Sequence, residues 1–308
     1  MQQQIQNNVK NSVPEKIAIL YIALGRYGVF WKDFYRSCEK YFLSDCKKTY
    51  FLWTDNKKID FEKNKNVVKI NQKKLGWPYD TMMRFDLFLQ KETELKNFDY
   101  IFFFNANMIF KKEVGKEILP DDDNDGLVVG LHPWFRNSRP DEFTYDRNPD
   151  STSCIPFGEG KVYVQGCLNG GTAAAYLELC RICKNNIDQD LKNGVIALWH
   201  DESHLNKYIL NKNPLIMPHT YLYPENWKMS EDVKIVQLDK TNPKYGGIEW
   251  LRGISNIRQK APLPFVVYCK SCLKHIFSVS KNDKHKFIKF LGIKIALRLK
   301  RHDGTQKS

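Results

Sequence analysis

The sequence predicts an α/β fold in which short apolar strands alternate with helices around a sheet. The first observation is an uninterrupted apolar run over 17–24, which has the length and composition of a buried parallel strand. The second is a pair of further strand-like runs, 48–53 and 99–104, with segments of helical periodicity between the three strands. This order predicts a ligand at the carboxyl ends of the strands.

The other elements follow the same alternation along the chain. A polar break at 25–28 ends the first run, and the aromatic spacing after it predicts a helix over 29–42. Beyond Tyr223 the chain is rich in loops, and no internal repeat is present. The remaining patterns predict strands at 67–70, 126–131 and 162–165, and helices at 81–95 and 172–192, the last one opened by Gly170-Gly171.

The composition indicates a globular protein without a membrane-spanning helix. Its 308 residues, 42% apolar and 13% aromatic, are enough for one large domain or two small ones. No run of about 18 apolar residues occurs, and the N-terminal residues lack the apolar stretch of a secretory signal. We therefore expect the eight cysteines to be thiols in the reducing cytoplasm. The expected organisation is a flexible arm over 1–14, a main domain over 15–262 and a basic amphipathic tail over 263–308.

Two cysteine pairs have C-x-x-C spacing, Cys180/Cys183 and Cys269/Cys272. A zinc site would have to bring the pairs together, and no histidines with matching spacing accompany them. Cys180 and Cys183 also lie one turn apart in an expected helix. The spacing therefore favours one face of a helix over a metal site.

The net charge of +13 is concentrated in the tail. Residues 270–308 contain eleven Lys and Arg against two Asp, a net charge of +9 that leaves +4 for the rest of the chain. The main domain is therefore not expected to bind nucleic acid. Bases and apolar residues interleave over 284–301, with helical spacing at first and alternation in the last third, so we assign it no secondary structure. Its composition favours peripheral contact with an anionic membrane. A solvated tail or a small subdomain is the alternative.

The densest group of titratable residues is Trp199–Tyr208, which contains two histidines, two acids and a lysine. Such clusters are costly to bury unless they are used, so we take Glu202 as a candidate catalytic carboxylate. His200 and His204 have the spacing of a zinc-peptidase helix, but that motif requires Glu where Asp201 stands. A polar helix start with acids at its positive end is the structural alternative.

Two further polar segments carry weaker signals. Asn105-Ala106-Asn107 follows the apolar strand 99–104, and its amides are poor ligands for Mg²⁺ or Mn²⁺ because they bring no charge. By itself this tripeptide indicates a polar turn. The glycines at 158–160 and 170–171 lack the spacing of either nucleotide-binding fingerprint.

Six segments together resemble glycosyltransferase family 6, which contains the blood-group A and B transferases and the α-1,3-galactosyltransferases. The resemblance covers roughly residues 16–255, and its most specific parts are WHDESHLNKY and FTYDR. The segments, in order, are NANM (105–108), GKEILP (115–120), LHPWF (131–135), EFTYDRNPDSTSCIP (142–156), EGKVYVQGCLNGG (159–171) and WHDESHLNKY (199–208). The resemblance implies a GT-A fold, with a single Rossmann-like nucleotide-sugar transferase domain.

The implied activity is that of a retaining α-1,3-hexosyltransferase. It would move galactose or N-acetylgalactosamine from a UDP-sugar to a galactose-terminated oligosaccharide, fucosylated or plain, of a surface glycan such as lipopolysaccharide. Glu202 occupies the family's catalytic position, where a carboxylate stabilises an oxocarbenium-like transition state. The resemblance leaves two roles open for it, a covalent glycosyl intermediate or charge stabilisation during front-face attack. A lectin-like protein that binds galactosides without turnover is the alternative.

The chain departs from the animal members at Asn105 and Asn107, which replace a metal-binding Asp-x-Asp. The departure implies a metal-independent enzyme with no cofactor, in which fixed cations neutralise the leaving diphosphate. Arg84 matches the family's phosphate-side arginine. Lys240 and Arg252 match a C-terminal clamp that would fold over the donor as a lid.

The resemblance also assigns the remaining binding residues. Cys167 fills part of the space that a glycine would leave for an N-acetyl group, which favours galactose. Trp134 stands where the family often has glycine, which implies a different acceptor. The donor-binding residues are Ile22, Ala23 and Tyr27 at the uracil, with Arg84, Asn105, Ala106, Asn107, Gln165, Gly166, Cys167, Asp201, Lys240 and Arg252. The acceptor-binding residues are His132, Trp134, Thr144, Trp199 and His200.

Overall fold

The computed structural model describes residues 15–260, 277–281, 285–290 and 293–298. The chain divides into two compact units, residues 1–258 and residues 259–308. The expected flexible arm over 1–14 lies outside the described residues.

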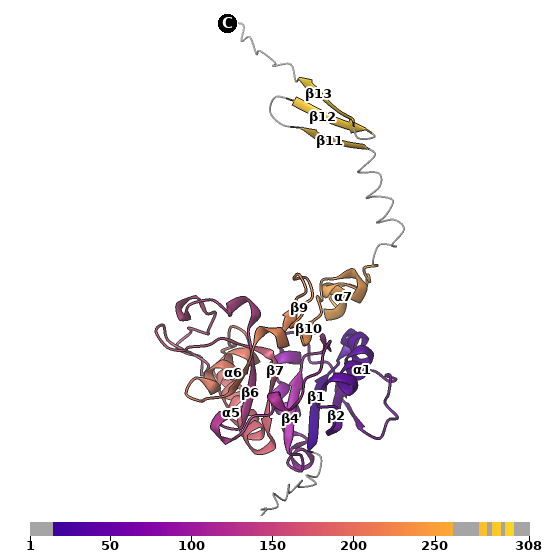
Figure 1. Cartoon of the computed structure of the whole chain (residues 1–308). Helices are drawn as coiled ribbons and strands as arrows, with labels where there is room; N and C mark the ends of the chain where they lie inside the picture. The colour runs from indigo at the N-terminus through magenta and orange to yellow at the C-terminus, as the bar shows by residue number, and fades with distance from the viewer. Residues whose placement is uncertain (1–14, 261–276, 282–284, 291–292, 299–308) are drawn as a thin grey trace, which may run out of the picture. The chain divides into compact units, whose positions relative to one another are not determined.

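The larger unit is built on a seven-stranded sheet with the strand order β3-β2-β1-β4-β7-β6-β8 (Figure 1). Four of its strands run parallel and supply one half of the sheet. β7 is antiparallel to both of its neighbours, β4 and β6, and β8 is parallel to β6. The predicted α/β class is confirmed. The strands are β1 (Lys16–Ile22), β2 (Lys47–Thr54), β3 (Val67–Asn71), β4 (Tyr100–Phe104), β6 (Leu127–Leu131), β7 (Val164–Thr172) and β8 (Leu215–Met217).

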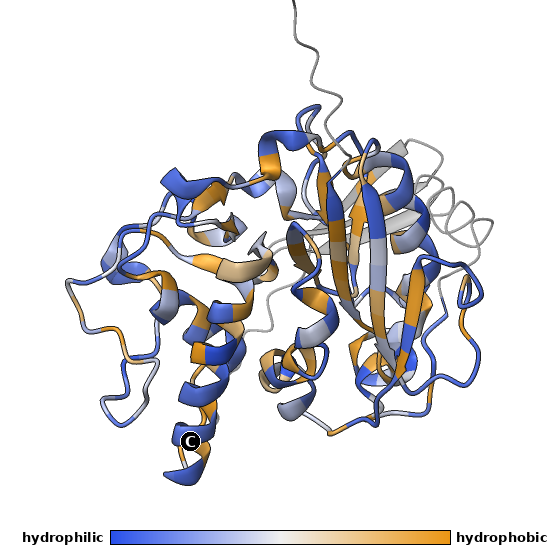
Figure 2. Ribbon diagram, turned by 90° about the horizontal axis from the view of Figure 1, so that it is seen from below, coloured by the Kyte–Doolittle hydropathy of each residue, from blue (hydrophilic) through white to orange (hydrophobic). Residues whose placement is uncertain are grey.

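Helices cover both faces of this sheet. Ile17, Ile19 and Tyr21 of β1 share a buried cluster with α1 (Trp31–Tyr41). Ala18 and Leu20 point to the other face and share a second cluster with α3 (Arg84–Leu89) and α5 (Ala173–Lys192). Because successive side chains of a strand face opposite ways, a sheet covered on both sides needs strands that are apolar throughout. Figure 2 shows this concentration of hydrophobic residues in the strands.

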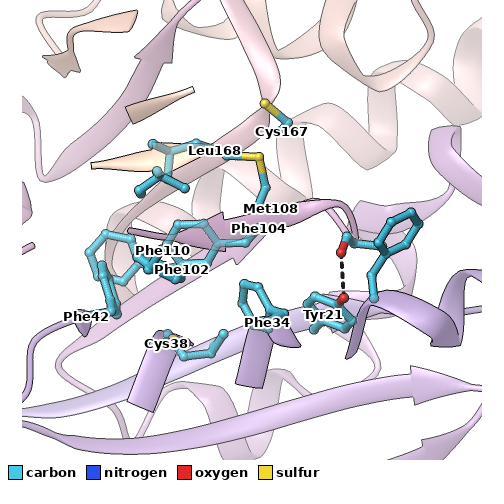
Figure 3. Close-up of a cluster of buried hydrophobic side chains, with 14 of the residues drawn as sticks. Tyr21, Phe34, Cys38, Phe42, Phe102, Phe104, Met108, Phe110, Cys167 and Leu168 are labelled. Atoms are coloured by element: carbon cyan, nitrogen blue, oxygen red, sulfur yellow. Dashed lines mark hydrogen bonds between the residues drawn. The ribbon is translucent and has the colours of Figure 1, made fainter. Parts of the chain in front are cut away.

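An aromatic core lies under the carboxyl end of β4. Phe102 and Phe104 pack against Phe42, whose ring meets both of theirs edge to face (Figure 3). The hydroxyl of Tyr21 donates a hydrogen bond of 2.7 Å to the backbone carbonyl of Ala106. This bond and the core below it fix the turn that carries Asn105-Ala106-Asn107.

A second, three-stranded sheet and several short helices complete the larger unit. The sheet has the order β5-β10-β9, with β5 (Met108–Phe110), β9 (Tyr223–Pro224) and β10 (Ile235–Gln237). The other α-helices are α2 (Tyr79–Met82), α4 (Glu92–Leu95), α6 (Asp201–Ile209) and α7 (Ile248–Arg252). The 3₁₀ turns are η1 (Gly25–Phe30), η2 (Lys116–Ile118), η3 (Asp122–Asn124), η4 (Pro133–Phe135), η5 (Pro140–Glu142), η6 (His219–Tyr221) and η7 (Pro243–Tyr245).

Two sequence-based predictions of elements were wrong. The helix expected over 81–95 is three short helices, α2, α3 and α4. Gly170-Gly171 lies inside β7, which is longer than the strand expected at 162–165, and the helix expected over 172–192 is present as α5 directly after it. A Cβ atom on Gly170 would come within 2.5 Å of the Ile101 carbonyl oxygen, so the glycine permits close pairing of β7 with β4.

The described part of the smaller unit is a three-stranded antiparallel sheet of β11 (Phe277–Lys281), β12 (His285–Phe290) and β13 (Ile293–Arg298). The sequence pattern had left the secondary structure of this tail open. Ile288 and Ile295 are directly paired, and the Ile295 side chain is exposed. Within the described residues, none of the helices combines the length and the hydropathy that a membrane crossing requires.

The cysteine pair within the larger unit has a packing role. Cys180 and Cys183 are fully buried on the face of α5 that packs on the sheet, as their spacing predicts for one side of a helix. Cys269 and Cys272 lie outside the described residues.

Candidate active site

The carboxylate of Glu202 is held by strand β7. Glu202 lies in the first turn of α6, and its Oε2 accepts a hydrogen bond of 2.8 Å from the backbone N–H of Gly166. Its Oε1 accepts a hydrogen bond of 2.9 Å from the Tyr163 hydroxyl. Asn206, one turn further along α6, both donates to and accepts from the backbone of Val164 at 3.0 Å. The helix that carries Glu202 is therefore tied to β7 at two successive turns.

Close approach of α6 to β7 explains the glycine at position 166. A Cβ atom there would lie 3.1 Å from Oδ2 of Asp201 and 3.3 Å from Cβ of Glu202. His200, the residue before the helix, has φ +54° and ψ −122°, a conformation that non-glycine residues rarely adopt. Such strain is typical of positions that the surrounding structure holds in place.

Arg84 links three parts of the site. Its Nη2 lies 3.0 Å from Oδ2 of Asp201, and its Nη1 donates to the carbonyl of Gly166 at 2.8 Å. Its Nε donates to the carbonyl of Thr81 at 3.1 Å, and its guanidinium stacks on Phe103. The side chain is 5% exposed. Arg84 therefore neutralises Asp201 and fixes the geometry around Gly166 in addition to lining the cleft.

Burial raises the pKa values of both acids at the start of α6. The pKa of Asp201 rises to about 6, although the Arg84 guanidinium opposes the shift. The pKa of Glu202 rises to about 7, although the Gly166 N–H and the Tyr163 hydroxyl stabilise its charged form. These are the shifts that a carboxylate acquires when it is withdrawn from water.

A pocket rich in cations lies at the carboxyl ends of β1 and β4. It contains four basic side chains and one acid, Asp80, whose carboxylate already accepts backbone N–H groups from Leu75 and Gly76. An excess of positive charge over a partly apolar cavity suits a nucleotide with its phosphates. Its lining is Ile22, Leu24, Tyr27, Lys74, Trp77, Asp80, Thr81, Arg84, Phe103, Asn105, Ala106, Lys240 and Arg252.

Lys240 is the most distinctive cation of this cation-lined pocket. Its side chain is half-buried, and within residues 15–260 its Nζ has neither a hydrogen-bond acceptor nor a carboxylate partner. Burial lowers its pKa, and the positive charges of Arg252 and Arg84 lower it further. Arg252 stacks over the ring of Trp77 at 4.5 Å. A bound anion would relieve this uncompensated charge.

A second pocket, walled by aromatic side chains, adjoins the first. The two pockets share Trp77, Thr81, Arg84, Asn105 and Lys240, so they form one continuous cleft. The second pocket is lined by Glu202 and Asp201, by the predicted donor residues Gln165, Gly166 and Cys167, by all five predicted acceptor residues, and by Phe135 and Gln237. Aromatic walls with scattered polar groups suit the stacking and hydrogen bonding of sugar rings.

Most of the predicted site residues line one of these two pockets, but two of them line neither. Ala23 is fully buried, and its carbonyl accepts hydrogen bonds from Thr54 and Asn56. Asn107 is 2% exposed, and its Nδ2 donates to the carbonyl of Leu238 at 2.7 Å. Of the Asn-x-Asn pair, Asn105 lines both pockets, whereas Asn107 lines a further pocket that shares Gln165 and Lys240 with the second one.

The histidine pair of the WHDESH segment does not share a site. His200 lines the cleft and meets Trp77 edge to face, with 5.0 Å between ring centroids. His204 is buried on the other side of α6, with its Nε2 3.7 Å from Oδ2 of Asp190. The zinc-peptidase interpretation requires both rings on one ion, and this geometry does not provide that.

Sequence reasoning missed two parts of the site. The first is the segment from Lys74 to Thr81, with Trp77 at its centre, which follows the end of β3. The rule that ligands lie beyond the carboxyl ends of parallel strands could have found it. The second is Tyr163, which reads as an ordinary strand residue and gives no signal in the sequence.

Comparison with known proteins identifies the family. The family description "Glycosyltransferase family 6" matches residues 2–249. The O-antigen biosynthesis glycosyltransferase WbnI of Escherichia coli is 36% identical over 234 residues, which are 76% of this chain and 99% of that protein. The globoside α-1,3-N-acetylgalactosaminyltransferase 1 of Gallus gallus is 28% identical over 74% of this chain and 68% of its own length. The histo-blood group ABO system transferase 2 of Rattus norvegicus is 31% identical over 64% of this chain and 60% of its own length.

The α/β domain and its two-part cleft are thus those of a glycosyltransferase with a GT-A-like fold. The chain belongs to glycosyltransferase family 6.

Proposed function

We propose that this protein is a retaining α-1,3-glycosyltransferase that transfers galactose, with N-acetylgalactosamine as the weaker alternative, from a UDP-sugar to a galactose-terminated oligosaccharide. The observation that carries the proposal is the place of Glu202, in the aromatic pocket directly beside the cation-lined one. Two relatives support the linkage and a surface-glycan acceptor, one an α-1,3-N-acetylgalactosaminyltransferase and the other an O-antigen transferase.

The reaction follows from this placement. The diphosphate of the donor lies against Lys240 and Arg252, and the sugar extends past Gln165 and Cys167 toward Glu202. The bond between the anomeric carbon and the phosphate oxygen breaks, and its electron pair leaves with UDP. The acceptor O3 forms the new bond and its proton passes to the departing phosphate oxygen, while the Glu202 carboxylate stabilises the positive charge at the anomeric carbon.

We further propose that the transfer needs no divalent metal. Asn105 and Asn107 bring no charge, and the Asn107 amide is already bonded to Leu238. Lys240 and Arg252 supply fixed positive charge on the phosphate side of the cleft instead. Fixed cations can stabilise a leaving diphosphate without the reorganisation that solvent requires.

Cys167 supports the preference for galactose. It is 3% exposed, and its thiol donates to Oε1 of Gln165 at 3.2 Å, so it is fixed beside the sugar position. A side chain of this size reduces the room for an N-acetyl group, and such steric differences are worth about 1–3 kcal/mol. We therefore expect a preference of about 10- to 100-fold in kcat/KM.

A donor screen in the presence of EDTA tests the proposal. UDP-galactose and UDP-N-acetylgalactosamine are offered with fucosylated and plain galactosides, and the linkage and anomeric configuration of the product are determined by NMR. We expect α-1,3-linked galactose and a rate that EDTA leaves unchanged. Galactoside binding without turnover would instead indicate a lectin-like protein, and a requirement for Mn²⁺ would overturn the metal-independent mechanism.

We also propose that the basic tail holds the enzyme peripherally on the cytoplasmic face of an anionic membrane. Strand β12 (His285–Phe290) and strand β13 (Ile293–Arg298) combine basic with apolar residues, and Ile295 is 52% exposed. Each basic residue at an anionic surface contributes about 1 kcal/mol.

Vesicle flotation tests the tail. Neutralising Lys286, Lys289 and Lys294 with Gln should weaken binding to phosphatidylglycerol vesicles by about 100-fold, with binding to phosphatidylcholine weak throughout. The matched control replaces three exposed lysines of the larger unit, Lys57, Lys58 and Lys63. Equal loss in both triple variants would show that net charge alone is responsible.

A further inference from the structure

Tyr163 contacts the carboxylate of Glu202 from behind the cleft. Its hydroxyl lies 2.9 Å from Oε1 of Glu202, whereas its other acceptor, the carbonyl of Thr144, is 3.5 Å away. A phenol has one proton to donate, so the shorter, charge-assisted bond to the carboxylate takes it. Tyr163 is 1% exposed and does not line either pocket. Its hydroxyl therefore does not touch the substrate, and it acts on the reaction through the carboxylate of Glu202.

The ring of Tyr163 is fixed by the wall of the acceptor pocket. Its centroid lies 4.8 Å from that of Phe135 and 5.3 Å from that of His132. Tyr145 packs on it at 5.3 Å, and the backbone N–H of His132 donates to the Tyr163 carbonyl at 3.0 Å. Because packed rings in a protein interior have little freedom, the hydroxyl is presented to Glu202 in one direction.

From this geometry we propose that Tyr163 is a positioning residue, which orients the Glu202 carboxylate and keeps it in its charged form for glycosyl transfer. The inference rests on the proposed function for its catalytic consequence, but its effect on Glu202 can be measured without turnover. Burial raises the pKa of the Tyr163 phenol, and the charge of Glu202 raises it further. The hydroxyl thus stays protonated, and it remains a donor over the whole working range of pH.

Removing this hydroxyl should change the ionisation of Glu202 in a defined direction. Burial raises the pKa of Glu202, and the hydrogen bond from Tyr163 lowers it because it stabilises the charged carboxylate. Without this bond, in Tyr163→Phe, the pKa of Glu202 should rise above about 7. The acid limb of the kcat profile should move to higher pH. The other charged or titratable groups facing this carboxylate stay in place in the variant, and they are Asp201, Arg84, Cys167, Lys240, His132 and His200.

Magnetic resonance of one amide provides the direct test. Gly166 N–H donates to Oε2 of Glu202, so its chemical shift reports the protonation of that carboxylate. Gln165-Gly166 is the only Gln–Gly pair in the sequence. In the full chain labelled with ¹³C-carbonyl glutamine and ¹⁵N-glycine, only the Gly166 amide is bonded to a ¹³C carbonyl, so its signal alone is selected. We expect its titration midpoint to move up by one pH unit or more in Tyr163→Phe, and the Glu202 titration to vanish in Glu202→Gln.

Kinetics of the same variants complete the test. Tyr163→Phe should lower kcat by about 10-fold or more, the usual scale for a hydrogen bond to a charged group, with the KM for the UDP-sugar unchanged. Tyr145→Phe is the matched control, because it removes a neighbouring phenol that bonds to the carbonyl of Val162 and not to Glu202. It should leave the midpoint in place.

An unchanged Gly166 midpoint in a folded Tyr163→Phe variant would overturn the inference. A shifted midpoint in a protein that transfers no sugar would uphold the contact with Glu202 and would overturn the proposed function instead.

Discussion

Replacing Glu202 by Gln is expected to lower kcat by about 100- to 1,000-fold, with UDP affinity within a few-fold of the wild-type value. The amide keeps the shape of the side chain but removes the negative charge that would stabilise the developing sugar cation. UDP affinity should persist because Glu202 does not line the cation-lined pocket. Single-turnover transfer from UDP-galactose and calorimetric titration with UDP measure the two quantities.

Glu159→Gln is the matched control for this variant. Glu159 lies in the same segment as Tyr163 and Gly166, but its side chain is exposed. It should retain full activity. If Glu202→Gln also retained activity, the carboxylate would have no part in the transfer.

The same Glu202 variant should be more stable than the wild-type protein at alkaline pH. The pKa of Glu202 is about 7 in the fold against an ordinary value of 4.5, so the folded state binds more protons than the unfolded chain between these values. Stability therefore falls as the pH rises through this window. Gln carries no such cost, and we expect its free energy of unfolding to exceed the wild-type value by about 1–3 kcal/mol at pH 8. Below about pH 4.5 this difference in the free energy of unfolding should disappear. Urea unfolding curves measure it, and a cooperative transition in them also shows that the variant is folded.

Replacing Lys240 by Met is expected to reduce kcat/KM for the UDP-sugar by about 100-fold or more, the usual scale for losing one charge-stabilising group. The lysine is half-buried beside Arg252 and Arg84, so its charge acts on the diphosphate in a medium where screening is weak. Methionine keeps the length and packing of the stem. Stability should not fall, because the substitution relieves repulsion among the three cations.

Two comparisons make the Lys240 result decisive. Lys244→Met removes an exposed lysine from the next turn of the chain and should leave the kinetics unchanged. Added Mn²⁺ should not restore the activity of Lys240→Met, because Asn105 and Asn107 provide no charged ligand. Recovery with Mn²⁺ would contradict the proposal that fixed cations, and not a bound metal ion, stabilise the leaving diphosphate.

Local patterns in the sequence were sufficient for the framework of the protein. The apolar runs that became β1, β2 and β4 identified the buried strands, since a sheet covered on both faces imposes an apolar residue at every position. The acids at the start of α6 marked the cleft, because such groups are costly to bury without a use. The resemblance to family 6 then gave these residues their roles.

Tertiary contacts decided what the side chains do. Arg84 was expected to be a cation for phosphate, yet its guanidinium is also bonded to Asp201 and to the Gly166 carbonyl, 82 residues away. Gly170-Gly171 was expected to open a helix, but the close approach of β4 places the pair inside β7. The pattern of the tail did not choose between helix and strand, and cross-strand pairing produced a sheet.

The sequence by itself determined the α/β class and the family, and it singled out Glu202 as the candidate catalytic carboxylate. Only the tertiary structure joined the cation-lined and aromatic pockets into one cleft, placed Trp77 between them and aimed the Tyr163 hydroxyl at Glu202. The physical reason is range: strand and helix patterns repeat within a few residues, whereas Tyr163 and Glu202 are 39 residues apart and meet only because α6 packs on β7.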